Sequence, residues 1–122
     1  MIPLNEFHVY QVSMEIGEMV WKIVDRWSYF SKDTLGKQLV KSADSIALNI
    51  AEGYGRYFYK ENRVFCYYSR GSAKETLSAI TKAKSRNLIT SDESESLNKK
   101  LDRYFSLMAG YIKSIGNDST SK

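Results

Sequence analysis

The stretch "SIALNIAEGYGRYFYKENR", residues 45–63, decides the fold of this chain because one expected helix ends in it and another begins. Ile46 and Ile50 recur at the spacing of one helix face, which predicts that the first part packs against a core. Gly53 and Gly55 then predict the end of this helix, since glycine adopts the left-handed conformation common at helix C-termini. A cluster of basic and aromatic residues follows the break.

Length and composition indicate one small helical domain. The chain has 122 residues, of which 43% are hydrophobic and 26% charged, so a single core is expected. We expect a domain over residues 1–116 and a flexible tail over residues 117–122. The single cysteine, Cys66, excludes an internal disulfide and favours a reducing compartment. With neither a signal peptide nor a membrane span apparent in the sequence, we expect a cytoplasmic protein that does not enter a membrane.

Three breaks, "SYFSKDTLG", "EGYGRYF" and "NLITSDES", divide the chain into four segments of helical length. Short connections between four helices predict an all-α fold, an up-down-up-down antiparallel four-helix bundle. Ser91 or Asp92 is the expected N-cap of the last helix. Its core seam has a 4-3-4-3-4 spacing and consists of Leu97, Leu101, Tyr104, Met108, Tyr111 and Ile115.

The first helix is apolar over more of its circumference than one core requires. At 100° per residue its apolar side chains cover an arc of roughly 200°, whereas one packed face needs about 100°. Two neighbouring helices of a monomer would cover such an arc. A second subunit would also cover it, and the position of Tyr10 and Trp21 at its edge favours this interpretation.

Polar residues accompany the core stripe of the second helix, in a row formed by Ser42, Ser45, Asn49 and Glu52. Half-buried polar groups require hydrogen-bond partners. We therefore expect Asn49 to bridge helices or subunits, and Glu52 to pair with an arginine such as Arg63 or Arg70. The alternative is a solvated edge of the helix.

The third helix carries a row of basic residues without an intervening acid. Residues 31–89 hold eleven basic and five acidic residues, so positive charge is concentrated in the middle of the chain. Such a row is typical of a surface that contacts phosphates, and neighbouring tyrosines such as Tyr57, Tyr59 and Tyr67 could stack on unpaired bases. A solvated basic exterior is the alternative. The candidate nucleic-acid-binding residues are Arg56, Lys60, Arg63, Tyr67, Arg70 and Lys74.

The sequence offers little catalytic chemistry. His8 is the one histidine, and no nucleophile stands near it in the sequence. Phosphate-binding glycine loops and the Glu-x-x-His pairs of di-iron bundles are missing from the sequence. Cys66 falls on the expected inner face of the third helix and is interpreted as a packing residue. This face is expected to consist of Phe65, Tyr68, Ser72, Thr76 and Ala79, with Cys66, Ala73, Leu77 and Ile80. We therefore expect no enzyme activity, no cofactor and no metal site.

Two linked motifs resemble the four-helix-bundle family encoded in intervening sequences of bacterial 23S ribosomal RNA genes. The resemblance covers nearly the whole chain. Asp44 departs from the pattern by placing an acid in a small or basic stretch, and Tyr10 stands where the family often has tryptophan. The first motif is carried by Gln38, Leu39, Lys41, Ala43, Ser45, Ile46, Asn49, Ile50, Ala51, Glu52 and Gly53, and the second by Gly71, Ser72, Ala73 and Glu75.

The resemblance implies a bundle that assembles into a ring-like homopentamer and binds nucleic acid, including the ribosomal RNA from which the family takes its name. Similar bundles act as accessory subunits of reverse transcriptases in diversity-generating retroelements. We therefore expect a non-enzymatic oligomer that binds RNA through its basic row. The alternative is a scaffold for a protein partner such as a reverse transcriptase. Asn49, Glu52 and Gly71 are interpreted as structural.

Overall fold

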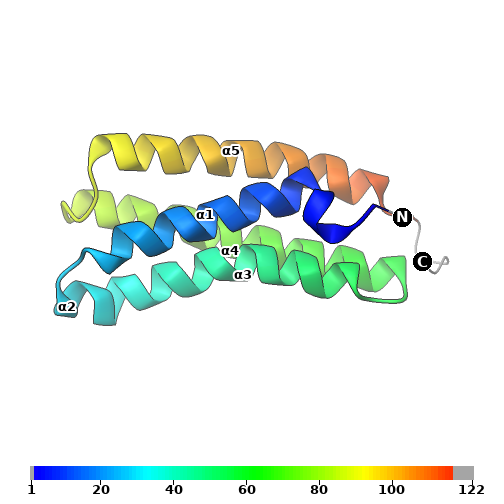
Figure 1. Ribbon diagram of the computed structural model, residues 1–122, viewed down its shortest axis with the longest axis horizontal. Coiled ribbons are helices and arrows are strands. Elements are labelled where there is room, and N and C mark those ends of the chain that lie inside the picture. The colour runs from blue at the N-terminus through cyan, green and yellow to red at the C-terminus, as the bar shows by residue number, and fades with distance from the viewer. Residues whose placement is uncertain (1, 117–122) are drawn as a thin grey trace.

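The computed structural model describes residues 2–116, and the secondary structure of these residues is helical, as predicted. Successive long helices lie side by side, and each starts near the end where the preceding one finishes (Figure 1). The expected tail at residues 117–122 lies outside the described residues. The four long helices are α1 (His8–Asp25), α3 (Lys37–Tyr54), α4 (Tyr59–Ser85) and α5 (Ser91–Ser114).

A membrane span is not found in this part of the chain: within residues 2–116, no helix combines the necessary length with the necessary apolar character.

The first expected break is largely helical in the structure. After α1 ends, the chain turns and begins the short helix α2 (Tyr29–Ser31), which continues through the π-helix η2 (Lys32–Gly36) into α3. The backbone N–H of Lys37 donates to the carbonyl oxygen of Lys32, five residues earlier. The expected break at "SYFSKDTLG" was therefore wrong for most of its length.

Two expected helix ends also differ from the structure. Gly55 caps α3 with a φ of −77°, so the left-handed conformation is not used there. Thr90, rather than Ser91 or Asp92, is the N-cap of α5. Its hydroxyl accepts from the backbone N–H of Glu93, and the Glu93 carboxylate accepts from the backbone N–H of Thr90. This reciprocal capping box satisfies two donors that a helix start leaves unpaired.

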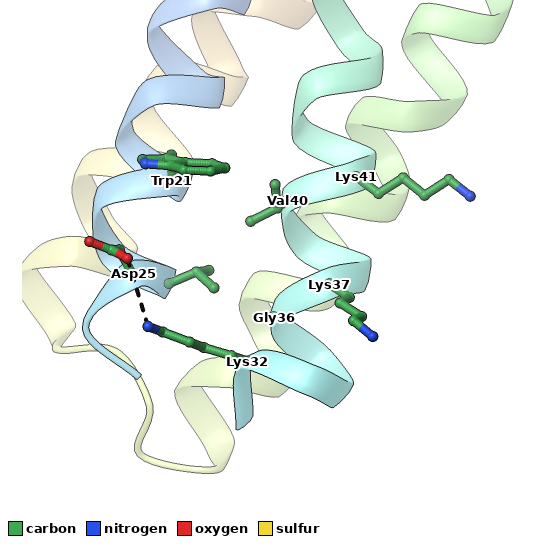
Figure 2. A pocket seen from close by; sticks show the side chains of 8 residues that line it. Trp21, Asp25, Lys32, Gly36, Lys37, Val40 and Lys41 are labelled. Atoms are coloured by element: carbon green, nitrogen blue, oxygen red, sulfur yellow. Dashed lines mark ion pairs between the residues drawn. The ribbon is translucent and has the colours of Figure 1, made fainter. Parts of the chain in front are cut away.

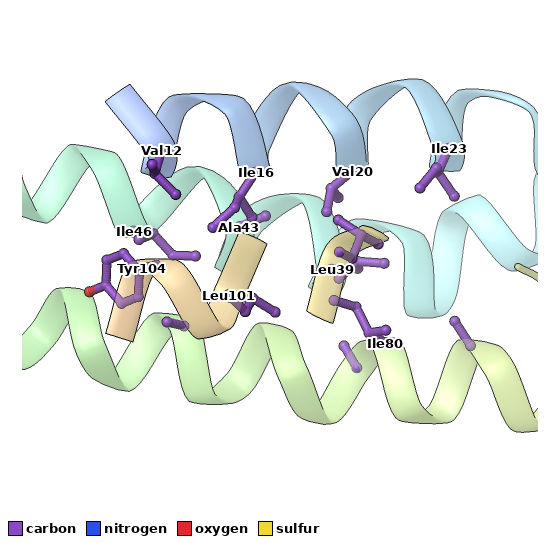
Figure 3. Close-up of a cluster of buried hydrophobic side chains, with 14 of the residues drawn as sticks. Val12, Ile16, Val20, Ile23, Leu39, Ala43, Ile46, Ile80, Leu101 and Tyr104 are labelled. Carbon is purple, nitrogen blue, oxygen red and sulfur yellow. The ribbon is translucent and has the colours of Figure 1, made fainter. Parts of the chain in front are cut away.

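The core lies between the four long helices and is filled mainly by aliphatic side chains (Figure 3). Ile16 and Val20 of α1 face Leu39 and Ile46 of α3, and Leu101 of α5 lies among them. The predicted seam of α5 is confirmed. Its first four members, Leu97, Leu101, Tyr104 and Met108, are fully buried, while Tyr111 and Ile115 pack at its edge.

The contact between α3 and α4 is unusual because hydroxyl groups cross it. The Thr76 hydroxyl donates to the Ser42 hydroxyl over 2.9 Å. The Ser69 hydroxyl donates to the Ile46 carbonyl oxygen over 2.8 Å and lies 2.6 Å from the Tyr104 hydroxyl. Ser69 therefore connects three helices, and each of these buried hydroxyls has a partner.

Within the chain, Asn49 does not form the expected bridge to another helix, and Glu52 pairs with an arginine other than Arg63 or Arg70. A bridge from Asn49 to another subunit stays a prediction. The Asn49 side chain donates to the Ser45 carbonyl oxygen of its own helix. Glu52 pairs with Arg56, four residues later, over 2.7 Å. Polar bridges between helices exist as anticipated, but Ser42, Ser69 and Thr76 form them because these residues face the neighbouring helix directly.

Gly53 permits the close contact of α3 with the start of α4. A Cβ atom at this position would lie 2.9 Å from the Phe65 Cβ and 3.0 Å from the Asn62 carbonyl oxygen. Contacts this short require a displacement of the backbone or of Phe65. The glycine of the first motif is therefore a packing residue.

Candidate nucleic-acid interface

The basic row, defined as Lys60, Arg63, Tyr67, Arg70 and Lys74, runs along the side of α4 that adjoins α5. Lys74 is exposed, and its ammonium lies 4.4 Å from the centre of the Phe105 ring of α5. The Arg70 guanidinium lies 5.2 Å from the centre of the Tyr67 ring. Both cations thus rest on aromatic rings, an arrangement that is favourable electrostatically and leaves their outer sides accessible.

Arg63 and Arg56 differ from the rest of the predicted set. Arg63 is half-buried and donates to the carbonyl oxygen of Gly116, so it ties α4 to the chain beyond α5. Arg56 precedes α4 and lies on its α3 side, over the Phe65 ring at 4.8 Å. The structure therefore brings Lys60, Tyr67, Arg70 and Lys74 together and places Arg56 apart from them.

The exposed cations of the row are not neutralised by neighbouring acids. Within residues 2–116, Lys60, Arg70 and Lys74 form no ion pair. On the opposite side of α5, by contrast, Lys100 pairs with Glu15 of α1. Exposed cations such as Lys60, Arg70 and Lys74 attract a polyanion, because each contact with a phosphate displaces bound counterions.

Exposed aromatic rings lie on the first half of α4 and in the turn that precedes it. Tyr57 and Tyr67 are exposed as the proposed contact with bases requires, whereas Tyr59 is half-buried. The sequence interpretation missed two further exposed rings, Phe58 and Tyr68.

Tyr68 was expected on the inner face of α4, and this expectation was wrong. Its ring contacts Phe65 edge-on at 5.4 Å, on the α3 side of the helix, and its side chain remains largely exposed. The inner face is formed instead by smaller residues such as Cys66, Ser69 and Ala73, and Cys66 is buried as predicted. The sequence did contain a sign that Tyr68 is exposed, because this residue follows the outward-facing Tyr67 directly and lies one turn before Gly71.

A second surface, the apolar patch, lies on the outer side of α1 and α3 and is defined by Met14, Trp21 and Leu48. These side chains are 46%, 57% and 65% exposed. Trp21 lies across a hollow of about 330 Å³ whose floor includes Val40, and the nearby Lys32 pairs with Asp25 (Figure 2). The wide apolar arc of α1 is therefore only partly covered by its own chain.

An acidic pair lies within the apolar patch. Asp44 of α3 and Glu18 of α1 line one hollow together with Met14 and Leu48. Partial burial raises the pKa of Asp44, and the negative charge of Glu18 raises it further. The residue that departs from the family pattern is thus an acid in an unfavourable setting for its charge.

Within residues 2–116, no three His, Cys, Asp or Glu side chains are grouped so that they could hold a metal ion. Burial raises the pKa of the Tyr104 hydroxyl beneath the row, so Tyr104 remains neutral and serves as a hydrogen-bonding group in the core. At its surface α4 presents cations, aromatic rings and carboxylates such as that of Glu75.

Fold and surface together define the class: a small all-α bundle with a basic, aromatic face on one helix. The chain belongs to the 23S rRNA-intervening sequence protein family, whose pattern matches residues 5–110. The chain is also similar in fold to a crystal structure from Bacteroides thetaiotaomicron, described as a protein with unknown function from the S23 ribosomal protein family. That similarity has a TM-score of 0.77 at 21% sequence identity and covers 87% of this chain and 99% of the other. Among curated proteins, none matches this chain.

Proposed function

We propose that this protein is an oligomeric, non-enzymatic RNA-binding bundle that contacts RNA phosphates through Lys60, Arg70 and Lys74. The observation that carries the proposal is that these three exposed cations lack acidic partners among the described residues. Membership of a family named after an intervening sequence of 23S rRNA makes ribosomal RNA the first candidate ligand. This ligand in turn favours action in the cytoplasm.

The proposed scaffold is an up-down-up-down antiparallel bundle, which the successive directions of the long helices in Figure 1 support. Self-association through the apolar patch would cover Met14, Trp21 and Leu48, which water otherwise surrounds. A ring of five copies is the arrangement that the family resemblance implies. In such a ring each copy would supply its own basic row, so several weak phosphate contacts would add up along one RNA.

Binding of RNA at increasing salt concentration tests the proposal, with the mass of the assembly measured by light scattering. We expect the logarithm of the affinity to fall linearly with the logarithm of the salt concentration, because phosphate contacts release counterions. The variant Lys60→Glu/Arg70→Glu/Lys74→Glu should lose most of the binding. Arg63 is left unchanged in this variant because its contact with Gly116 is structural.

The matched control reverses three exposed cations elsewhere, in Lys22→Glu/Lys84→Glu/Arg103→Glu. It changes the net charge by the same amount but leaves the basic row intact. If both triple variants weaken binding equally, only net charge matters and the row is not a site. Binding no stronger than that of an unrelated basic protein would overturn the proposal.

A second candidate function, a scaffold for a protein partner such as a reverse transcriptase, is favoured by the apolar patch. Bare apolar side chains around an acidic pair fit a protein surface better than a polyanion. The variant Met14→Glu/Leu48→Glu separates the two roles of the patch. Loss of the assembly assigns it to contacts between copies, whereas an unchanged mass leaves it free for a different protein.

A further inference from the structure

Gly71 is a glycine that packing within the chain does not explain. It lies in the interior of the 27-residue helix α4, where glycine is less favourable than alanine. Around the position of a Cβ atom at Gly71 there is open space, with nothing within 4 Å among the described residues. Gly53, by contrast, is required by the neighbouring helix. The interpretation of Gly71 as a structural residue therefore lacks a contact to support it.

The missing side chain uncovers the turn that carries Tyr67 and Tyr68. Side chains of an α-helix lean toward its N-terminus, so a residue covers the surface of the preceding turn. Gly71 follows Tyr67 by four residues and Tyr68 by three, which places all three on neighbouring positions of the helix surface. Tyr67 and Tyr68 are 46% and 56% exposed. A flat saddle of bare backbone between two rings results.

Each of the two tyrosines of this saddle has a neighbour that packs against its ring. Arg70 lies over the Tyr67 ring on the α5 side, and Phe65 contacts Tyr68 edge-on on the α3 side. On the C-terminal side of the saddle, Lys74 follows Gly71 by three residues and supplies a cation toward α5, while exposed Glu75 follows by four residues and supplies an acid. Flat apolar surface therefore lies directly beside groups that attract phosphate.

We propose that the Gly71 saddle, formed by Tyr67, Tyr68 and Gly71, holds an unpaired base of RNA whose phosphates contact Arg70 and Lys74. This inference rests on the proposed RNA binding and specifies its substrate: single-stranded RNA in place of duplex. A duplex keeps its bases stacked inside and presents mainly phosphates and sugars, so it gains nothing from exposed rings. An unpaired base can stack on aromatic side chains, and glycine permits its close approach to the helix.

The test compares a 12-nucleotide oligouridylate, which has no stable secondary structure, with a 12-base-pair RNA duplex, by fluorescence anisotropy. In Gly71→Leu the new side chain covers the saddle, and we expect about tenfold weaker binding of oligouridylate, as for loss of one stacked base. Binding of the duplex should remain unchanged, because every cation of the row is still present. Tyr67→Ala/Tyr68→Ala should likewise weaken binding of oligouridylate selectively.

Gly110 of α5 provides the matched control. It too is exposed within a helix and has nothing within 4 Å of its missing Cβ atom, yet Ser106 and Leu107 occupy the positions equivalent to Tyr67 and Tyr68. Both Gly110→Leu and Gly71→Leu should raise the melting temperature, because leucine favours the helix more than glycine. Gly110→Leu should leave the affinity for oligouridylate unchanged.

The outcomes separate the saddle from the general RNA-binding proposal. If the wild-type protein binds RNA but Gly71→Leu changes neither affinity, or changes both equally, the saddle proposal is overturned and the proposal for the basic row is retained. If Gly71→Leu leaves RNA binding intact but changes the mass of the assembly, the glycine serves contacts between copies, and the saddle is overturned. If the wild type binds neither RNA, both proposals fail.

Discussion

The inner and outer sides of α4 differ in the size of their side chains and in how their polar groups are paired. Inside, small residues such as Ser69 and Thr76 lie close to the neighbouring helices, and their hydroxyls are fully partnered. Outside, long cations rest on rings and have free outer sides. We therefore expect changes on the inner side of α4 to destabilise the protein, and changes on the outer side to leave its stability nearly unchanged and to affect only the proposed binding.

Gly53→Ala should have the largest effect, because the inner side of α4 leaves no room for the added methyl group. We expect a loss of about 3 kcal/mol in the free energy of unfolding, at the upper end for overpacking of a core. Urea unfolding followed by circular dichroism measures this loss. Gly55→Ala is the control, since its Cβ would lie 3.6 Å from the nearest atom, in ordinary contact. Equal effects of the two substitutions would contradict close packing at Gly53.

Ser69→Ala should rank second, with a loss of about 2 kcal/mol, because the Ile46 carbonyl and the buried Tyr104 hydroxyl each lose a partner. Ser78→Ala, on the exposed side of the same helix, is the control and should remain within about 0.5 kcal/mol of the wild type. A Ser69→Ala variant as stable as this control would mean that the hydroxyl contacts between helices contribute little.

On the outer side, Lys60→Glu/Arg70→Glu/Lys74→Glu should change the free energy of unfolding by no more than about 0.5 kcal/mol. The row loses two cation–ring contacts, and the repulsion between Arg70 and Lys74 is replaced by a similar repulsion between two glutamates. A glutamate at position 60 offsets part of this loss, because an acid in the first turn of a helix is favourable. Thermal unfolding at low and moderate salt provides the measurement. A loss as large as that of Ser69→Ala would show that the row supports the fold, and the separation of the two sides would not hold.

Asp44→Asn should have the smallest effect on the free energy of unfolding, and this effect should be stabilising, whereas those of Gly53→Ala and Ser69→Ala are destabilising. The pKa of Asp44 is raised above 3.8 in the folded state, so its charged form opposes folding at neutral pH. The substitution should therefore stabilise the protein by about 0.3 kcal/mol at pH 7, after allowance for solvent screening. The gain should disappear below the unfolded pKa, where Asp44 is protonated in both states. A destabilised variant at pH 7 would indicate that the Asp44 carboxylate has a favourable partner.

The aliphatic parts of this fold could be predicted from the sequence, and the small-residue parts could not. Leu97 and Leu101 recur with helical period in a polar background, so the α5 seam was evident. On α4, buried Ser69 and exposed Tyr68 reverse the usual relation between side-chain size and burial, and the predicted inner face was therefore rotated. Pattern reasoning has no means of detecting that Ser69 finds partners on two other helices.

The sequence predicted which kinds of residue form the candidate site, but not all of the contacts that these residues make. Lys60, Arg70 and Lys74 share an exposed side of α4, as their spacing indicated. Arg63 meets Gly116 only because α5 returns beside α4, and the sequence does not reveal this contact. The pair of Glu52 with Arg56 has the local i,i+4 spacing, so it could have been found in the sequence.

The π-helix Lys32–Gly36 has a consequence for how the length of this chain can vary. A π turn closes its hydrogen bonds over one more residue than an α turn, so the segment accommodates a one-residue insertion without interrupting the helix. Relative to α3, the insertion rotates Tyr29 and Phe30 by about 100° from where a continuous α-helix would place them. The first connection of the bundle can therefore gain or lose single residues while Leu39 and Ile46 keep their register in the core.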